Sequence, residues 1–352
     1  MTTGEIDGAA GRAPRLADVA RIAGVSVSTA SRALSRPEMV AAGTRERVAA
    51  AAERVGFRFH PSARALTTGR TGLLALCVPT LANPLYAPVV EGAQRAAEEI
   101  GNEILVVVGE GSAEREFGLF ERLRDQVDGF IAVRPHGGER ALADLRRGKP
   151  LVVVNRRMRG VSSVVFDTPG GLREIAERLT ALGHRRVAYI GGPEGSWMDP
   201  MRRAALEWPL TEAGGTVVTL GPYPPTFESG MDAAGELLTT GSTAAVAYNS
   251  MTLLGLLHRL TVLGVRVPDD LSLACADDLT GVGLAHPDIM ALHVPAQDAG
   301  ELAVRELMAE IDARAAGHDA RPRHRVIPVD LVGGDAAAPP PPRPAPPEEA
   351  LA

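Results

Sequence analysis

One stretch near the N-terminus, from Leu16 to Ser35, strongly limits the folds open to this chain. In its first half, apolar residues recur at helical spacing as far as Gly24, and glycine readily ends a helix in the left-handed conformation. Ser26 follows and can cap a second helix, on which Ala30 and Ala33 form an apolar face. The pattern predicts a helix-turn-helix, a unit whose second helix fits the major groove of DNA.

Charge separates two interpretations of this helix pair, because short alanine-rich pairs with a glycine turn also occur as ordinary packing units. The segment from Arg12 to Arg70 holds 11 Arg and four acidic residues, a net charge of +7. The whole chain carries −6, so the remaining segments together carry −13. Positive charge confined to one segment suits a surface that binds phosphates. We therefore expect the N-terminal segment to bind double-stranded DNA.

Length, cysteine usage and the absence of long apolar runs limit the class of protein. The chain has 352 residues, 45% of them hydrophobic, which is sufficient for about two or three domains with their own cores. Cys77 and Cys275 stand in apolar runs without the spacing of metal ligands, so we expect buried thiols and neither metal nor cofactor. No signal peptide and no run of about eighteen apolar residues is present, which indicates a soluble, cytoplasmic protein with no membrane partner.

From Gly72 onward, apolar segments typical of buried strands alternate with helical patterns. The predicted strands cover 73–78, 103–108, 129–133, 151–154, 186–191, 217–220, 244–248 and 271–276. The predicted helices cover 86–99, 114–126, 171–182, 201–212, 227–238 and 252–263. This alternation predicts an α/β fold in which two doubly wound parallel sheets face each other across a cleft. Ligands would bind beyond the carboxyl ends of the strands.

Ordered motifs along the chain resemble those of the lactose-repressor/galactose-repressor (LacI/GalR) transcription factors. In the N-terminal segment they are Asp18-Val19-Ala20, Ala23-Gly24-Val25-Ser26, Thr29-Ala30-Ser31-Arg32-Ala33-Leu34, Thr44-Arg45-Glu46-Arg47-Val48, Gly56-Phe57-Arg58 and Pro61-Ser62-Ala63-Arg64-Ala65-Leu66. The resemblance covers about residues 14 to 333. It implies an all-α helix-turn-helix head followed by a bilobed domain similar to periplasmic binding proteins.

Five segments are expected on this basis. They are a disordered N-terminus (1–13), a helix-turn-helix DNA-binding domain (14–58), a hinge helix and linker (59–71), a bilobed effector-binding and dimerisation domain (72–334) and a Pro/Ala-rich disordered tail (335–352). Within the head, 44–55 is predicted to form a third helix, and Phe57 is predicted to close the small core. The family usually has a capping Ser where this chain has Ala41, and Thr44 can start the helix later instead.

The resemblance implies roles for polar residues of the second helix. Val27 and Ser28 occupy the two positions that contact base edges, and Arg32 is a further base or phosphate contact. Thr29 and Ser31 are expected to hold phosphates. Because the short Ser28 hydroxyl can serve more than one base, we expect weaker direct discrimination than a Gln or Arg would give.

The hinge segment carries two further expected contacts with DNA. Ala63 and Leu66 match hinge-helix residues that enter the minor groove at the operator centre, where Leu66 would act as an apolar wedge that kinks the duplex. Ordinary core packing is the alternative for Leu66. Phe59 and His60 replace the usual Pro-Asn, so the hinge helix lacks a good cap and is expected to form less readily.

Effector-binding residues are also implied by the resemblance. Asn83 and Tyr86 belong to a loop similar to the Asn-Pro-Phe-Phe loop of the family, in which Tyr86 could stack on a sugar ring or pad the wall. Arg202 falls at the effector-binding Arg, where a guanidinium can hold hydroxyls or a carboxylate. Its neighbour Arg203 is a competing assignment.

Three further positions complete the expected effector site. Asn249 and Asp277 match polar positions of the family, and an amide with a carboxylate suits adjacent sugar hydroxyls, although Asp277 could instead cap a loop. Asn155 aligns with a position after the fourth strand that often carries Asp, and Trp197 or Phe166 could add stacking.

The function implied is a homodimeric transcriptional regulator, expected to be a repressor, that binds a pseudo-palindromic operator. A small molecule, expected to be a sugar, would bind between the lobes and alter operator affinity. A solute-binding protein of a transport system would have a signal peptide and no basic head. An enzyme is disfavoured because the chain has no G-x-S-x-G motif, no Walker loop and no Cys/His cluster.

Overall fold

The computed structural model describes residues 14–35, 39–57, 70–280, 283, 288–334 and 339–340. The chain divides into two compact units, Met1–Leu73 with Gln126–Asp128, and Leu74–Asp125 with Gly129–Ala352. The Asp128 carboxylate accepts hydrogen bonds from the backbone N–H of Thr71 at 2.7 Å and of Gly72 at 2.8 Å.

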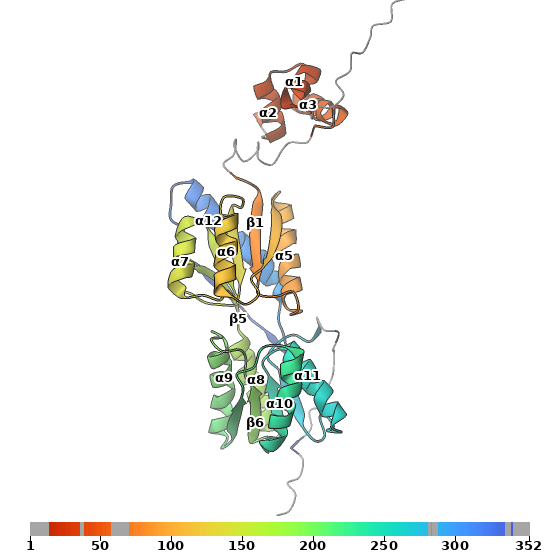
Figure 1. Ribbon diagram of the computed structural model, residues 1–352, viewed down its shortest axis with the longest axis vertical. Coiled ribbons are helices and arrows are strands. Elements are labelled where there is room, and N and C mark those ends of the chain that lie inside the picture. The colour runs from red at the N-terminus through yellow and green to blue at the C-terminus, as the bar shows by residue number, and fades with distance from the viewer. Residues whose placement is uncertain are drawn as a thin grey trace, which may run out of the picture. The chain divides into compact units, whose positions relative to one another are not determined.

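Three helices make up the described part of the head, α1 (Leu16–Ala23), α2 (Val27–Ser35) and α3 (Ala42–Arg54) (Figure 1). After α1, Gly24 adopts a φ of 66°, the left-handed conformation expected of a glycine at a helix end. The Ser26 hydroxyl accepts a hydrogen bond from the backbone N–H of Thr29 at 3.1 Å. Both the glycine stop and the serine cap predicted from the sequence are therefore confirmed.

The core of the head is built from small apolar residues of all three helices. It contains Val19, Ala20, Ala23, Ala30, Ala33, Val48, Ala51 and Ala52. Phe57 packs against this cluster, as predicted. The prediction that the third helix starts at Thr44 is wrong, because α3 begins at Ala42. The Ala41 carbonyl accepts a hydrogen bond from the backbone N–H of Thr44 at 2.9 Å. A backbone turn starts this helix without a side-chain cap.

Among its described residues, the second unit contains two six-stranded sheets. The first has the order β11-β5-β4-β3-β1-β2, formed by β1 (Leu73–Val78), β2 (Glu103–Val108), β3 (Gly129–Val133), β4 (Leu151–Val154), β5 (Ser162–Phe166) and β11 (His324–Ile327). The second has the order β12-β10-β9-β8-β6-β7, formed by β6 (Arg186–Ile190), β7 (Thr216–Leu220), β8 (Ala244–Ala247), β9 (Ser272–Cys275), β10 (Ile289–His293) and β12 (Asp330–Val332).

Strand pairing is parallel from β11 through β1 in the first sheet and from β10 through β7 in the second, whereas β12 pairs antiparallel with β10. The eight predicted strands are all present, and the predicted pair of parallel sheets is confirmed. Cys77 and Cys275 are buried free thiols within β1 and β9, also as predicted.

Helices flank the sheets of both lobes (Figure 1). Those of the first lobe are α5 (Tyr86–Glu99), α6 (Ala113–Leu123), α7 (Glu139–Gly148) and α12 (Ala296–Ala315). Those of the second lobe are α8 (Thr168–Ala181), α9 (Asp199–Glu212), α10 (Phe227–Thr239) and α11 (Ser250–Val262). The sequence did not predict α7, α12, β5, β10, β11 or β12. The chain crosses between lobes after β5, between β10 and α12, and between β11 and β12.

Glycines allow one helix pair in each lobe to cross at backbone contact. In the first lobe, a Cβ on Gly300 of α12 would lie 2.0 Å from the Val89 carbonyl oxygen of α5. In the second lobe, a Cβ on Gly230 of α10 would lie 2.1 Å from the Thr252 carbonyl oxygen of α11. No side chain larger than hydrogen fits at these crossings, so both helix pairs are locked closely together.

This packing predicts opposite effects for two alanine substitutions in α10. Gly230→Ala should lower the stability of the second unit by about 2–3 kcal/mol, because the new methyl group meets backbone that cannot move aside. Gly235→Ala, at an exposed position with open space around its Cβ, should raise stability by about 0.5–1 kcal/mol. Thermal melts of the two variants and the parent test this, and equal shifts would contradict the close crossing.

Candidate functional site

The outer face of α2 presents the residues expected to contact DNA. Val27 is 50% exposed, and Ser28 and Arg32 are also exposed. Thr29 and Ser31 are half-buried. Nη2 of Arg32 lies 3.4 Å from the Ser28 hydroxyl, one helical turn away, so these two side chains form one polar surface. Such a surface suits base edges and phosphates in a major groove. Ala63 and Leu66 lie outside the described residues.

Two adjoining cavities lie between the lobes of the second unit. The larger has a volume of about 680 Å³ and the smaller of about 350 Å³. They share Gly111, Arg134, His136 and Pro193 as lining residues. The lining comes mainly from loops that follow β1, β2, β3 and β4 in the first sheet and β6 and β7 in the second. Open parallel sheets bind ligands at this edge, as the sequence predicted.

The two cavities differ in chemistry. The larger has mainly apolar and aromatic walls, to which Pro79, Tyr86, Val108, Pro224, Pro225, Phe227 and Met251 contribute. The smaller is more polar and is lined by Asn155, Arg156, Glu194, Ser196 and Trp197 besides the shared residues. A ligand that fills both cavities would therefore need an apolar face or ring at one end and a polar group at the other.

Unusual backbone conformations occur at this edge of the first sheet. Glu110, Arg134 and Asn155 have φ values of 51°, 46° and 57° and are the non-glycine residues with positive φ in the described chain. Arg134 and Asn155 directly follow β3 and β4, and all three line the cavities. This conformation is costly for residues with a Cβ, and such residues cluster at binding sites.

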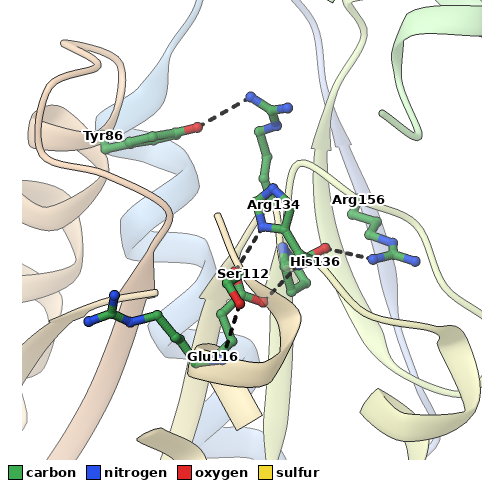
Figure 2. Close-up of polar contacts among 8 residues, drawn as sticks. Tyr86, Ser112, Glu116, Arg134, His136 and Arg156 are labelled. Atoms are coloured by element: carbon green, nitrogen blue, oxygen red, sulfur yellow. Dashed lines mark hydrogen bonds and ion pairs between the residues drawn. The ribbon is translucent and has the colours of Figure 1, made fainter. Parts of the chain in front are cut away.

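Hydrogen bonds hold the loops of the first lobe around the cavities (Figure 2). Glu116, which is 2% exposed, accepts the backbone N–H of His136 at 2.7 Å and contacts its Nδ1 at 2.9 Å. Nη1 of Arg134 donates to the Tyr86 hydroxyl at 3.3 Å, and Nη1 of Arg156 donates to the Pro135 carbonyl at 2.6 Å. The loop that carries Arg134 and His136 is thereby fixed on several sides.

Four of the seven expected effector residues line these cavities. Asn83 and Tyr86 line the larger cavity, and Asn155 and Trp197 line the smaller. The Asn83 side chain also stabilises its own loop, because its Oδ1 accepts a hydrogen bond from the backbone N–H of Leu85 at 3.0 Å. Phe166, the alternative stacking residue, is a buried core residue that lines neither cavity.

The other three, Arg202, Asn249 and Asp277, lie behind the wall and line neither cavity. Asn249 caps α11, since its Oδ1 accepts the backbone N–H of Thr252 at 3.0 Å. Arg203, the competing assignment, is exposed and pairs with Glu207. Direct ligand contact by Arg202, Asn249 and Asp277 thus remains a prediction.

The buried Arg202 organises the second lobe beneath the cavities. Its Nε donates to the Thr168 hydroxyl at 3.0 Å, and its Nη1 donates to the Tyr248 carbonyl at 2.9 Å. Its Cζ also lies 5.0 Å from the centre of the Tyr248 ring, while the Cζ of Arg134 from the first lobe lies 5.7 Å from that centre. Tyr248 therefore contacts one guanidinium from each lobe.

Comparisons with known proteins identify the family. A model described as bacterial regulatory proteins, lacI family, matches residues 15–62, and one described as a periplasmic binding protein-like domain matches residues 176–336. The HTH-type transcriptional regulator CelR of Thermobifida fusca is 31% identical over 340 residues, which span 91% of this chain and 97% of CelR. The chain belongs to the LacI family. The regulator DegA of Bacillus subtilis is 27% identical and covers 92% of this chain and 97% of its own.

Solved structures support the LacI-family fold. The CelR–cellobiose complex matches with a TM-score of 0.66 at 29% identity, covering 91% of this chain and 98% of CelR. The lac repressor dimer bound to operator matches with a TM-score of 0.78 at 24% identity, covering the same shares of the two chains. The predicted fold, a helix-turn-helix head followed by a bilobed domain, is confirmed. In its described part, this LacI-family chain has no helix with the length and apolarity that a membrane span requires.

Sequence reasoning missed three polar residues that line the cavities of this LacI-family chain, Arg134, His136 and Arg156, and the buried Tyr248, which contacts Arg134. Arg134 directly follows a predicted strand, and Tyr248 is the last residue of another. Position at a carboxyl strand end was the signal that could have found both. Nothing in the sequence showed that the His136 and Arg156 loops meet, because that depends on the strand order.

Burial changes the protonation of one residue behind the cavity wall. Asp277 is 3% exposed, and burial raises its pKa to about 6, against the opposing effects of the Arg202 charge and of the Asp278 backbone N–H. A carboxyl whose pKa is higher in the folded state stabilises the fold fully below its unfolded pKa. That stabilisation is lost as the pH rises through about 6.

This shift predicts how stability depends on pH in an asparagine variant. Between pH 5 and 7.5, the parent should lose about 1–2 kcal/mol relative to Asp277→Asn, because only the parent carries the titrating carboxyl. Asp270→Asn is the matched control. Hydrogen bonds from Arg266 lower the Asp270 pKa, so its titration lies below this range. Melts at both pH values test the difference, and a constant offset for Asp277→Asn would contradict the shift.

Proposed function

We propose that this chain is a transcriptional repressor that binds a pseudo-palindromic operator as a homodimer in the cytoplasm, and that a sugar or sugar derivative in the inter-lobe cavities sets its operator affinity. The observation that carries the proposal is the presence, in one chain, of an exposed recognition face on α2 and of cavities at the carboxyl ends of two sheets. The similarity to CelR, whose structure is a complex with cellobiose, supports a carbohydrate effector.

Control of DNA binding would follow from the way the lobes are joined. Three chain crossings connect them, and residues of both lobes line the cavities. A ligand that contacts both lobes therefore favours one angle between them. Operator affinity changes only to the extent that the ligand distinguishes the two arrangements, typically by about 5- to 150-fold.

A pair of variants tests the DNA-binding half of this proposal. Arg32→Ala should weaken operator binding by about 5- to 100-fold, because it removes a base or phosphate contact and the Arg32 part of the polar surface shared with Ser28. Arg203→Ala removes an exposed arginine of α9 and should leave operator binding unchanged. The measurement is fluorescence anisotropy at two salt concentrations, with operator DNA selected from random sequences.

The outcomes of that measurement are distinct. Loss of operator preference over random DNA in Arg32→Ala but not in Arg203→Ala supports the recognition face on α2. Equal affinity of the parent for selected and random DNA would show that the chain is not a sequence-specific regulator.

A further inference from the structure

Two guanidinium groups at the smaller cavity have no carboxylate partner among the described residues. Nη1 of Arg156 bonds only a backbone carbonyl, and its buried Nε has no hydrogen-bond partner. Arg134 bonds the Tyr86 hydroxyl and lies near the Tyr248 ring. Neither arginine forms an ion pair with a described residue. Both guanidinium groups are partly buried, and a partly buried charge without an ion-pair partner can gain from an anionic ligand.

No acidic group nearby forms an ion pair with Arg134 or Arg156 among the described residues. For Arg134, burial disfavours the charged form, but nearby groups that include the charge of Asp277 raise its pKa. Glu110 pairs with Arg115, and both carboxylate oxygens of Glu116 are occupied by His136. Burial lowers the pKa of Arg156, and the charges of Glu139 and Glu116 oppose this effect without reversing it. Glu194 also lines the smaller cavity, but it is exposed to solvent, where water screens its charge.

The side-chain oxygen of Asn155, also at the smaller cavity, lacks a hydrogen-bond donor among the described residues. Asn155 is 6% exposed, lines the smaller cavity, and its Oδ1 is buried without a hydrogen-bond partner. An amide oxygen can only accept, so it requires a donor such as a hydroxyl group. Its left-handed backbone, at a φ of 57°, is a further cost at this position. Buried acceptors of this kind are normally satisfied, and a ligand hydroxyl would satisfy this one.

We propose that the effector is an anion, a sugar or similar hydroxylated ring that carries a phosphate or carboxylate group. The anionic group lies in the smaller cavity against Arg156 and Arg134, an adjacent hydroxyl donates to Asn155, and the ring extends into the apolar larger cavity. This inference rests on the proposed function, since it names the chemical class of the effector at the same site. A guanidinium can hold either oxyanion with two parallel hydrogen bonds.

Inorganic phosphate and the fluorescence of Trp197 provide a test that needs no knowledge of the ring. Trp197 lines the smaller cavity, and the other tryptophan, Trp208, is 60% exposed on α9. In the full-length Trp208→Phe protein, Trp197 is therefore the sole tryptophan reporter. Phosphate, acetate and chloride are titrated separately at constant ionic strength, and the melting temperature is recorded at each concentration.

The expected result is a saturable change in Trp197 emission and a rise in melting temperature with phosphate or acetate but not with chloride. The anion that binds with the higher affinity indicates whether the effector carries a phosphate or a carboxylate. On the same background, Arg156→Gln should weaken this binding at least tenfold. Arg159→Gln, which removes an exposed arginine three residues along the same loop, should leave it unchanged.

Two results would overturn the inference. One is the absence of a saturable, anion-specific response in both emission and melting temperature. The other is an equal response in the Arg156→Gln and Arg159→Gln proteins. Operator binding by the Trp208→Phe protein in chloride is measured alongside. A protein that binds operator tightly but ignores both anions would refute the anionic effector and leave the proposed regulator intact. A protein that binds phosphate or acetate but no operator would support the anion site and refute the proposed regulator.

Discussion

The contact of one tyrosine ring with two arginines connects the lobes at the point where a ligand would bind. Arg202 is tied to its own lobe by hydrogen bonds to Thr168 and to the Tyr248 carbonyl, as well as by the ring contact. Arg134 reaches Tyr248 from the other lobe through the ring contact alone. Cation–π contacts contribute only about 0.5–2 kcal/mol. Of the two arginine contacts with this ring, the one that joins the lobes is therefore held by fewer interactions, and a ligand bound beside it would alter it.

Because each lobe is closely packed, we expect such a change to move the two lobes as rigid bodies. The glycine crossings between α5 and α12 and between α10 and α11 leave no space for the helices to slide. The central strands of both sheets are buried and paired in parallel, with helices packed against them. We expect any change in the angle between the lobes to be taken up by the three crossing segments and the loops at the carboxyl strand ends. Those loops carry the polar residues of the proposed effector site, so the proposed binding and movement would occur at the same place.

The sequence predicted the buried parts of this fold well and its polar parts poorly. Fully buried parallel strands are near-continuous apolar runs, which made β1, β3, β4 and β8 easy to identify. The edge strand β11 is mostly exposed and its sequence is half polar, and the amphipathic α7 is rich in arginine, so neither stood out. At the site, Arg134 and Tyr248 stand at the ends of predicted strands but were not predicted as site residues, and no sequence pattern shows that their side chains meet. That depends on the strand order and on a positive φ at Arg134.

One titration tests most directly whether occupancy of the cavities and operator affinity are coupled. Anisotropy of labelled operator DNA and Trp197 emission are followed in one sample of the Trp208→Phe protein while glucose, glucose 6-phosphate and other matched neutral and anionic sugars are added at constant ionic strength. The account predicts that the sugar which saturates the Trp197 signal changes operator affinity at least about fivefold over the same concentrations. A sugar that saturates this signal and leaves operator affinity unchanged would contradict the account.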